Sequence, residues 1–367
     1  MRRLELWNGE IVDWCRSRRR PDVPLFHHSN IPVSERSLWL FSRRADCWLA
    51  SGGACIGLLA AIVLIFLHSD REIDALDFVL SEFHLGATYD AIIRRRLWRH
   101  RQGDVLLMPL IILALTYALS MSGKAILLTS ITMYAAVWHR GRQSLGVARF
   151  YQRQMGGAAS PMHNFLFRGA IYLPMLAATL AYTHLAPKEY EGEPYLALSV
   201  GAQATSAVGV GAMCWVIAYF IWTLWRSREI RIHPGERWVV LAHAVAFGSS
   251  YALGASNASF LLVLAVHHEV QYLYFTYAMV WRRELGQTGM GLSAESVSSK
   301  IPAASGGGLR PEIKVFVSFL LWPVVGFVAA TIGGWLEVEW LAPLGVGGLF
   351  CHYWLDGRIW TRQSFQN

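Results

Sequence analysis

Charged side chains are scarce in this chain of 367 residues. Asp, Glu, Lys and Arg together make up 16% of it, while hydrophobic residues make up 54%. A typical soluble domain has about a quarter of its residues charged. Apolar segments of about twenty residues recur instead, which is the length of helix that crosses a lipid bilayer. The composition therefore excludes an ordinary soluble enzyme and a disordered regulator.

The sequence also lacks the cysteine patterns of zinc knuckles and disulfide frameworks. None of its five cysteines has Cys-x-x-Cys spacing, and most lie in or beside apolar segments: Cys15, Cys47, Cys55, Cys214 and Cys351. They are interpreted as unpaired thiols. The net charge of +8 comes mostly from arginines clustered between apolar segments. Such clusters indicate orientation in a membrane, so no nucleic-acid partner is expected.

Ten membrane-spanning helices are predicted, so the expected fold is an all-α transmembrane bundle. Nine spans have the required apolar length. The remaining span, residues 73–93, is the second in chain order and contains acidic residues. It is included because a span there places the basic N-terminus and the arginines of 94–101 on the same side of the membrane. The predicted spans are 47–67, 73–93, 104–122, 125–145, 164–186, 197–225, 237–255, 258–281, 314–332 and 341–360.

With ten spans, every arginine-rich connection lies on one side of the membrane, which the positive-inside rule identifies as cytoplasmic. Both termini are then cytoplasmic, and the expected location is the bacterial inner membrane. The predicted organisation comprises a basic N-terminal segment (1–46), a bundle of eight spans (47–281), a cytoplasmic linker (282–313), and two last spans with a C-terminal tail (314–367).

Four of the even-numbered spans carry a histidine that is followed one helical turn later by another polar residue. Residues four apart lie on the same helix face. Even-numbered spans cross the membrane in one direction, and each histidine precedes the cytoplasmic arginines by a few turns, so the rings can share one layer. The pairs are His84 with Thr88, His139 with Gln143, His267 with Gln271, His268 with Tyr272, and His352 with Asp356.

These histidines are predicted to bind metal. An ionisable group at the bilayer centre costs roughly 2.5–3.5 kcal/mol and therefore needs a partner or a function. Imidazole is the commonest metal ligand, and imidazoles with one carboxylate suit iron. The predicted ligands, for one or two ions, are His84, His139, His267, His268 and His352, with His243 in reserve.

The neighbouring polar residues are assigned supporting roles. Asp356 is predicted to be a ligand or to orient one, and the candidate catalytic residues are Asp356, Tyr272 and Gln271. Thr88, Gln143, Gln271 and Tyr272 are expected to orient imidazoles through the second ring nitrogen. Glu82, Asp90 and Glu269 are alternative carboxylates.

The segment His-Leu-Gly-Ala-Thr-Tyr-Asp at residues 84–90, together with single histidines scattered over a polytopic chain, resembles the bacterial membrane carotene dioxygenases of the Brp/Blh type. More broadly, the chain is similar to integral-membrane histidine-ligated iron oxygenases. The resemblance covers only the histidine-bearing helices. It implies non-haem Fe(II), dioxygen and a lipid or isoprenoid substrate. The HxxxH and HxxHH boxes of fatty-acid desaturases and hydroxylases are missing.

Three other functions use the same features. Two histidines on neighbouring helices can be axial ligands of haem. The polar stripes can line a proton or solute path in a transporter. The N-terminal segment and the 282–313 loop are large enough to dock partners, as expected of an electron-donor complex or of a non-catalytic subunit. In every case the arginine-rich face suits anionic membrane lipids.

Overall fold

The computed structural model describes residues 39–40, 43–67, 81, 83–93, 96–155, 160–184, 189–190, 193–228, 230–254, 262–284, 321 and 342–359. Most of the predicted N-terminal segment 1–46, of the linker 282–313 and of the span 314–332 lies outside these residues. The described chain is helical, as predicted, apart from one hairpin of two short strands.

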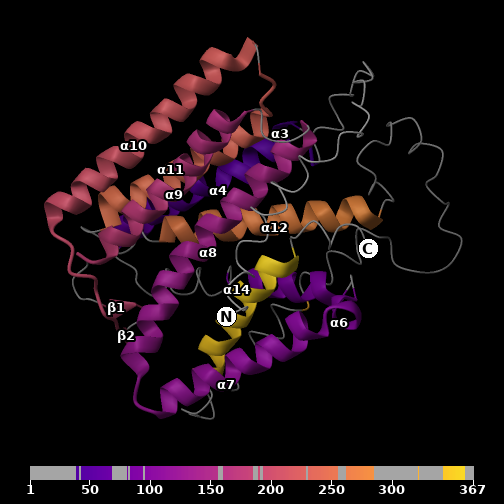
Figure 1. The fold of residues 1–367 in the computed structure, drawn as a ribbon, viewed down its shortest axis with the longest axis vertical. Coiled ribbons are helices and arrows are strands. Elements are labelled where there is room, and N and C mark those ends of the chain that lie inside the picture. The colour runs from indigo at the N-terminus through magenta and orange to yellow at the C-terminus, as the bar shows by residue number, and fades with distance from the viewer. Residues whose placement is uncertain are drawn as a thin grey trace, which may run out of the picture. The chain divides into compact units, whose positions relative to one another are not determined.

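The helices are arranged as Figure 1 shows. Residues 83–93 form a helix that carries no label in the figure and is called the 83–93 helix. The labelled elements are α3 (Arg43–Ala45), η3 (Asp46–Ala50), α4 (Ser51–Leu67), α6 (Leu97–His100), η4 (Gly103–Leu107), α7 (Met108–Met121), α8 (Ala125–Gln154), α9 (Pro161–Tyr182), β1 (Glu189–Tyr190), β2 (Glu193–Pro194), α10 (Ala202–Trp225), η5 (Arg226–Arg228), α11 (Pro234–Gly254), α12 (Leu262–Glu284) and α14 (Ala342–Ile359).

Three helical segments are long and apolar enough to cross a membrane: Gly103–Met121, Pro161–Tyr182 and Ala202–Trp225. They lie where spans 104–122, 164–186 and 197–225 were predicted. A shorter apolar helix, Gly52–Leu67, lies at the predicted span 47–67. Four further predicted spans coincide with α8, α11, α12 and α14, whose histidines and other polar residues lower their mean hydropathy.

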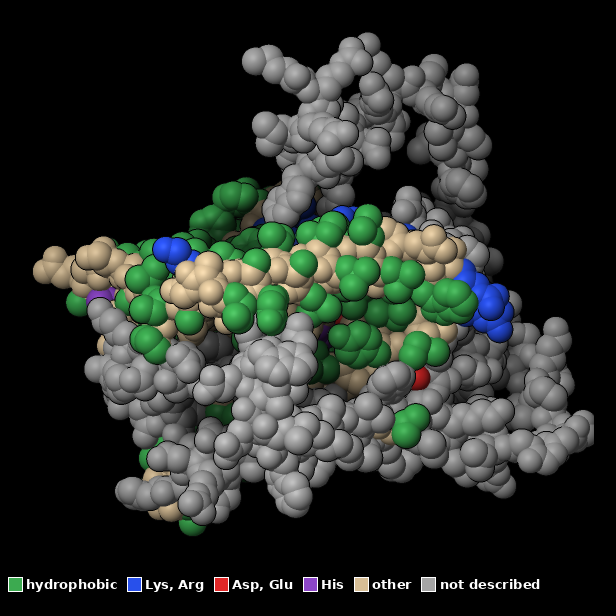
Figure 2. All heavy atoms as spheres, turned by 90° about the horizontal axis from the view of Figure 1, so that it is seen from below, with side chains coloured by type: hydrophobic (Ala, Val, Ile, Leu, Met, Phe, Trp, Pro, Cys, Tyr) green, Lys and Arg blue, Asp and Glu red, His purple; other side chains and the backbone are tan. Residues whose placement is uncertain are grey.

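The helix formed by η4 and α7 exposes apolar side chains along its length. Leu107, Leu110 and Leu115 are 57–64% exposed. Figure 2 views the molecule from the side on which α7 lies and shows hydrophobic side chains spread along a helix that has basic side chains near its two ends. Large exposed apolar surfaces mark contact with a membrane or a partner. Together with the three long apolar helices, this surface indicates membrane association.

Helix packing brings α12 to the centre of the bundle. α10 packs on α9, α9 on α11, α11 on α4, and α4 on α12 (Figure 1). α14 lies against α7, and the Trp354 indole nitrogen donates a hydrogen bond to the Asp104 carbonyl oxygen of η4 at 3.0 Å. α8 contacts both α12 and α14.

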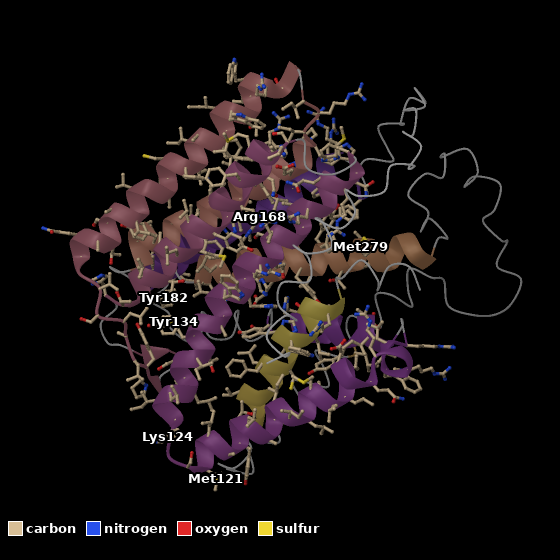
Figure 3. All side chains as sticks on the ribbon, in the orientation of Figure 1. Met121, Lys124, Tyr134, Arg168, Tyr182 and Met279 are labelled. Atoms are coloured by element: carbon tan, nitrogen blue, oxygen red, sulfur yellow. The ribbon has the colours of Figure 1, made fainter. Side chains whose placement is uncertain are left out.

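Tyrosine hydroxyls hold the segment after β2 against the first half of α8 and the C-terminal end of α9. β1 and β2 pair in antiparallel register, with Glu189 opposite Pro194. After β2, the Tyr195 hydroxyl donates to the Tyr182 carbonyl oxygen, and the Tyr134 hydroxyl donates to that of Leu196 at 3.1 Å. Figure 3 shows Tyr134 and Tyr182 close to this loop, and Met121 and Lys124 on either side of the α7–α8 connection.

Two buried carboxylates join helices that are distant in sequence. Glu236 on α11 accepts hydrogen bonds from the Tyr219 hydroxyl on α10, at 2.7 Å, and pairs with His163 Nε2 on α9, also at 2.7 Å. Asp46 accepts from the hydroxyls of Tyr151 and Tyr274 at 2.9 and 2.5 Å. A buried charge is tolerated when hydrogen-bonded in this way. His163 is buried between these helices.

Glycines allow α4 to approach the backbone of α12. A Cβ atom at Gly57 would lie 3.1 Å from the Cα and carbonyl oxygen of Val263. A Cβ atom at Gly53 would lie 3.1 Å from the His267 carbonyl oxygen. The spacing Gly-x-x-x-Gly is typical of close helix contacts in membranes. The opposing atoms belong to a helix backbone, so they cannot move aside as a flexible side chain would.

We expect Gly57→Ala to lower the melting temperature of the detergent-solubilised protein. The expected loss of unfolding free energy is about 1–3 kcal/mol, as for other overpacked contacts. Gly52→Ala is the matched control, because its Cβ would meet only Trp48 at 4.0 Å. Replacing a helix glycine with alanine otherwise stabilises by roughly 0.5–1 kcal/mol, so the control is expected to melt at the same temperature or higher. Equal melting temperatures for the two variants would contradict a close α4–α12 contact.

Candidate metal centre

Four histidines from four helices meet in one buried group, called here the four-histidine group: His84, His139, His268 and His352. They come from the 83–93 helix, α8, α12 and α14, respectively. Each offers one ligand atom, and these atoms all lie within 4.8 Å of one another. The closest described pair is His84 Nε2 and His352 Nε2, at 2.6 Å. None of the four side chains is more than 9% exposed.

The rings pack directly on one another. The His84 ring centroid lies 4.4 Å from that of His352 and 4.5 Å from that of His268. The His139 ring centroid lies 4.9 Å from that of His268 and 5.0 Å from that of His352. Tyr353 stacks on His139 at 4.4 Å, which covers the group on one side. The arrangement is compact and closed to water.

The spacing of the donor atoms is close to that around a single metal ion. Nitrogen ligands lie about 2.0–2.1 Å from zinc, so two nitrogens on opposite sides of such an ion are about 4.2 Å apart. The ligand atoms of the group, within 4.8 Å of one another, nearly meet this limit. Among the described residues, His84 Nδ1, His139 Nε2 and His268 Nδ1 have no hydrogen-bond partner. A buried polar atom left unpaired costs about 1–3 kcal/mol. This buried group could hold a metal ion.

Asp356 lies beside the group with one carboxylate oxygen facing it. Asp356 Oδ2 is 3.5 Å from His352 Nε2, 3.6 Å from His139 Nε2 and 3.9 Å from His84 Nε2. Asp356 and His352 are one turn apart on α14, so both side chains leave the helix on the same face. The carboxylate brings a negative charge to a set of ligands that are otherwise neutral imidazoles.

Thr88 and Tyr272 hold the other carboxylate oxygen. Asp356 Oδ1 accepts hydrogen bonds from the Thr88 hydroxyl at 2.8 Å and from the Tyr272 hydroxyl at 2.6 Å. Thr88 Oγ1 also lies 3.0 Å from His352 Nδ1 and 2.7 Å from the Tyr272 hydroxyl. The Tyr272 ring centroid is 4.0 Å from that of His84. These contacts place the predicted residues Asp356 and Tyr272 at the group.

His267 is not a member of the four-histidine group, although it was predicted to be a ligand. Consecutive helix residues point about 100° apart, so His267 and His268 face different neighbours. His267 Nε2 lies 3.4 Å from the Ser144 hydroxyl of α8. The reserve candidate His243 is also outside the group, and its Nε2 is 2.9 Å from the Ile171 carbonyl oxygen.

Gln271 and Gln143 connect α12 to α8. The Gln271 side-chain oxygen accepts from Gln143 Nε2 and from the Ser144 hydroxyl, both at 3.3 Å. Gln143 Nε2 also donates to the carbonyl oxygen of His268 at 2.7 Å. Gln143 was expected to orient an imidazole ring, and it instead fixes the backbone of the helix that carries His268.

The alternative carboxylates are not part of the group. Glu269 accepts a hydrogen bond from the Ser81 hydroxyl at 2.8 Å, and Asp90 is buried at the other end of the 83–93 helix. Glu82 lies outside the described residues. Asp356 is therefore the carboxylate that the described structure places against the histidines.

Comparison of the chain with protein-family models, with curated proteins and with solved structures gave no match.

Proposed function

We propose that this protein is a membrane-embedded, metal-dependent oxidoreductase that acts on a lipophilic substrate. One observation carries the proposal: buried histidines from four helices bring their ligand atoms within 4.8 Å of one another, beside the carboxylate of Asp356. Ionisable residues buried among the helices of a membrane protein generally serve a function. The ligands are His84, His139, His268 and His352.

Non-haem iron is the proposed metal. Several imidazoles with one carboxylate are a donor set that suits iron in oxygenases. Iron bound here would supply redox chemistry with dioxygen. The chain's own residues hold the ligands in place and exclude water, since the four histidines, Thr88, Tyr272 and Asp356 are all buried.

Haem fits these residues less well than a single ion. A haem macrocycle has to lie between the two axial ligands. The imidazole rings of the four-histidine group instead pack against each other. The ring centroids of His84 and His139 each lie 4.4–5.0 Å from those of His268 and His352. The centroids of His84 and His139 lie 6.2 Å apart. This packing favours a non-haem centre.

A lipophilic substrate is proposed because of the surroundings of the site. Two helices that pack on the helices of the site, α4 on α12 and α7 on α14, carry exposed apolar side chains. A molecule that dissolves in the bilayer can approach such a site more easily than a sugar or nucleotide can. The proposal includes the ten-span topology with cytoplasmic termini in a bacterial inner membrane, which the arginine-rich connections favour.

The test is purification of the full chain in detergent after expression with iron. We expect about one iron per chain by elemental analysis, no Soret absorbance, and oxygen consumption when isoprenoid or fatty-acyl probes are added. Protein without transition metal would overturn the metal site. Iron-loaded protein that consumes no oxygen with either class of probe would overturn the assignment as an oxygenase.

A further inference from the structure

We infer that Asp356 is a fifth metal ligand, bound through Oδ2 alone, and that Thr88 positions Asp356 and His352 together for metal binding. This inference rests on the proposed metal site. It adds a carboxylate oxygen to the four imidazole nitrogens. It assigns Thr88 a positioning role and not the role of a metal ligand.

The two oxygens of Asp356 face different surroundings. The hydrogen bonds that described residues make to this carboxylate all go to Oδ1, from the Thr88 and Tyr272 hydroxyls. Oδ2 faces three imidazole nitrogens at 3.5–3.9 Å, too far for strong hydrogen bonds. An oxygen surrounded by ligand nitrogens at this spacing is placed to share a cation with them.

Two hydroxyl donors on Oδ1 keep the carboxylate from binding with both oxygens. Thr88 and Tyr272 lie on different helices, and both are 2.8 Å or less from Oδ1. Hydrogen bonds to a charged oxygen are stronger than neutral ones. Rotation of the carboxylate toward the group would break both, so Oδ2 remains the oxygen that faces the histidines.

The Thr88 hydroxyl also determines which nitrogen of His352 carries the proton. A threonine hydroxyl has one hydrogen to donate. Thr88 donates it to the Asp356 carboxyl oxygen at 2.8 Å, so the Thr88 oxygen can only accept in its contact with the ring nitrogen at 3.0 Å. His352 Nδ1 must then be the donor in its contact with Thr88.

With the proton on Nδ1, the lone pair of His352 Nε2 points into the group, where it accepts from His84 Nε2. This is the nitrogen that faces the group, 2.6 Å from His84 Nε2 and 3.5 Å from Asp356 Oδ2. A hydrogen bond at the outer nitrogen commonly fixes the tautomer and orientation of a metal-binding imidazole. One hydroxyl from the 83–93 helix therefore prepares two ligands that lie one turn apart on α14.

The experiment is a cobalt(II) titration of full-length protein stripped with a chelator, because the visible spectrum of cobalt reports its ligands. We expect Thr88→Val to weaken cobalt binding by about 10–100-fold, the usual effect of losing such a partner, and to change the spectrum. Thr88→Ser, which keeps the hydroxyl, is expected to restore both. Asp356→Asn should weaken binding at least as much as Thr88→Val.

Tyr272→Phe is the second variant. It removes one of the two donors to Asp356 Oδ1 but keeps the ring that packs on His84. Its effect on cobalt affinity is expected to be smaller than that of Thr88→Val, and its melting temperature without metal shows whether the fold is intact.

The two proposals fail in different ways. If wild-type protein binds no cobalt, the metal site itself is wrong. If wild-type protein binds cobalt and His352→Ala does not, while Thr88→Val and Asp356→Asn match the wild type in affinity and spectrum, then the fifth ligand and its positioning by Thr88 are wrong and the metal site stands.

Discussion

Replacing His352 with alanine is expected to remove the bound metal almost completely, whereas replacing His267 leaves the metal content unchanged. His352 contacts His84, Thr88 and Asp356 at the centre of the four-histidine group. Losing a partner outside the ligand set already costs about 10–100-fold in metal affinity, and losing a ligand costs more. The metal-to-protein ratio of each purified variant is the measurement. The same loss is expected for His84→Ala, His139→Ala and His268→Ala.

His267→Ala is a matched control for His268→Ala. The two residues are adjacent on α12, both are buried, and both substitutions remove the same atoms. A general loss of packing would therefore reduce metal content in both variants. A ligand role for His268 alone reduces it only in the second. Equal loss in the two variants, or none in either, would contradict the four-histidine group as the binding site.

Removal of the metal is expected to lower the unfolding free energy by about 4 kcal/mol when the free ion is kept near a thousand times its dissociation constant. A bound ion would join four helices, and without one ring nitrogens are left buried without hydrogen-bond partners among the described residues. Thermal unfolding in detergent, with chelator and then with iron added back, measures the change.

The matching variant for this experiment is His268→Ala, which should unfold at the same temperature with and without chelator because it holds no ion. A wild-type midpoint that does not move on chelation would show that no ion links these helices. Recovery of the midpoint on adding iron excludes damage by the chelator.

The sequence predicts the helices and most of the site for one physical reason. Polar residues are costly inside a membrane, so the few that occur in apolar helices stand out. Thr88, His139, His352 and Asp356 lie in helices at the expected places, and their side chains come together. α8 continues to Gln154, past the predicted end at residue 145, because its second half buries side chains as an amphipathic helix does.

The choice between His267 and His268 could not be made from the sequence. Both are followed one turn later by a polar residue, Gln271 or Tyr272, so the pattern is the same on both faces. Packing decides the matter: Gln271 bonds to side chains of α8, while Tyr272 reaches Asp356 on α14. The Gly-x-x-x-Gly spacing at Gly53 and Gly57 marks the face of α4 that meets another helix, but it does not identify which side of α12 lies there.

The contacts of Thr88 could not be predicted from the i, i+4 spacing either. Its partners on α14 lie 264 and 268 residues away in sequence. Spacing along a single helix indicates which side chains share a face, but not which face of another helix meets them. The contact between His163 and Glu236 is of the same kind, since Glu236 lies on another helix, 73 residues away.

The four histidines are widely separated along the chain, from His84 to His352. During synthesis, the ribosome must therefore reach α14 before the last imidazole and the adjoining carboxylate of Asp356 are made. A nascent chain that stops short of α14 holds three of the rings and lacks the fourth. A metal ion held by all four rings would therefore distinguish chains that include α14 from chains that end before it.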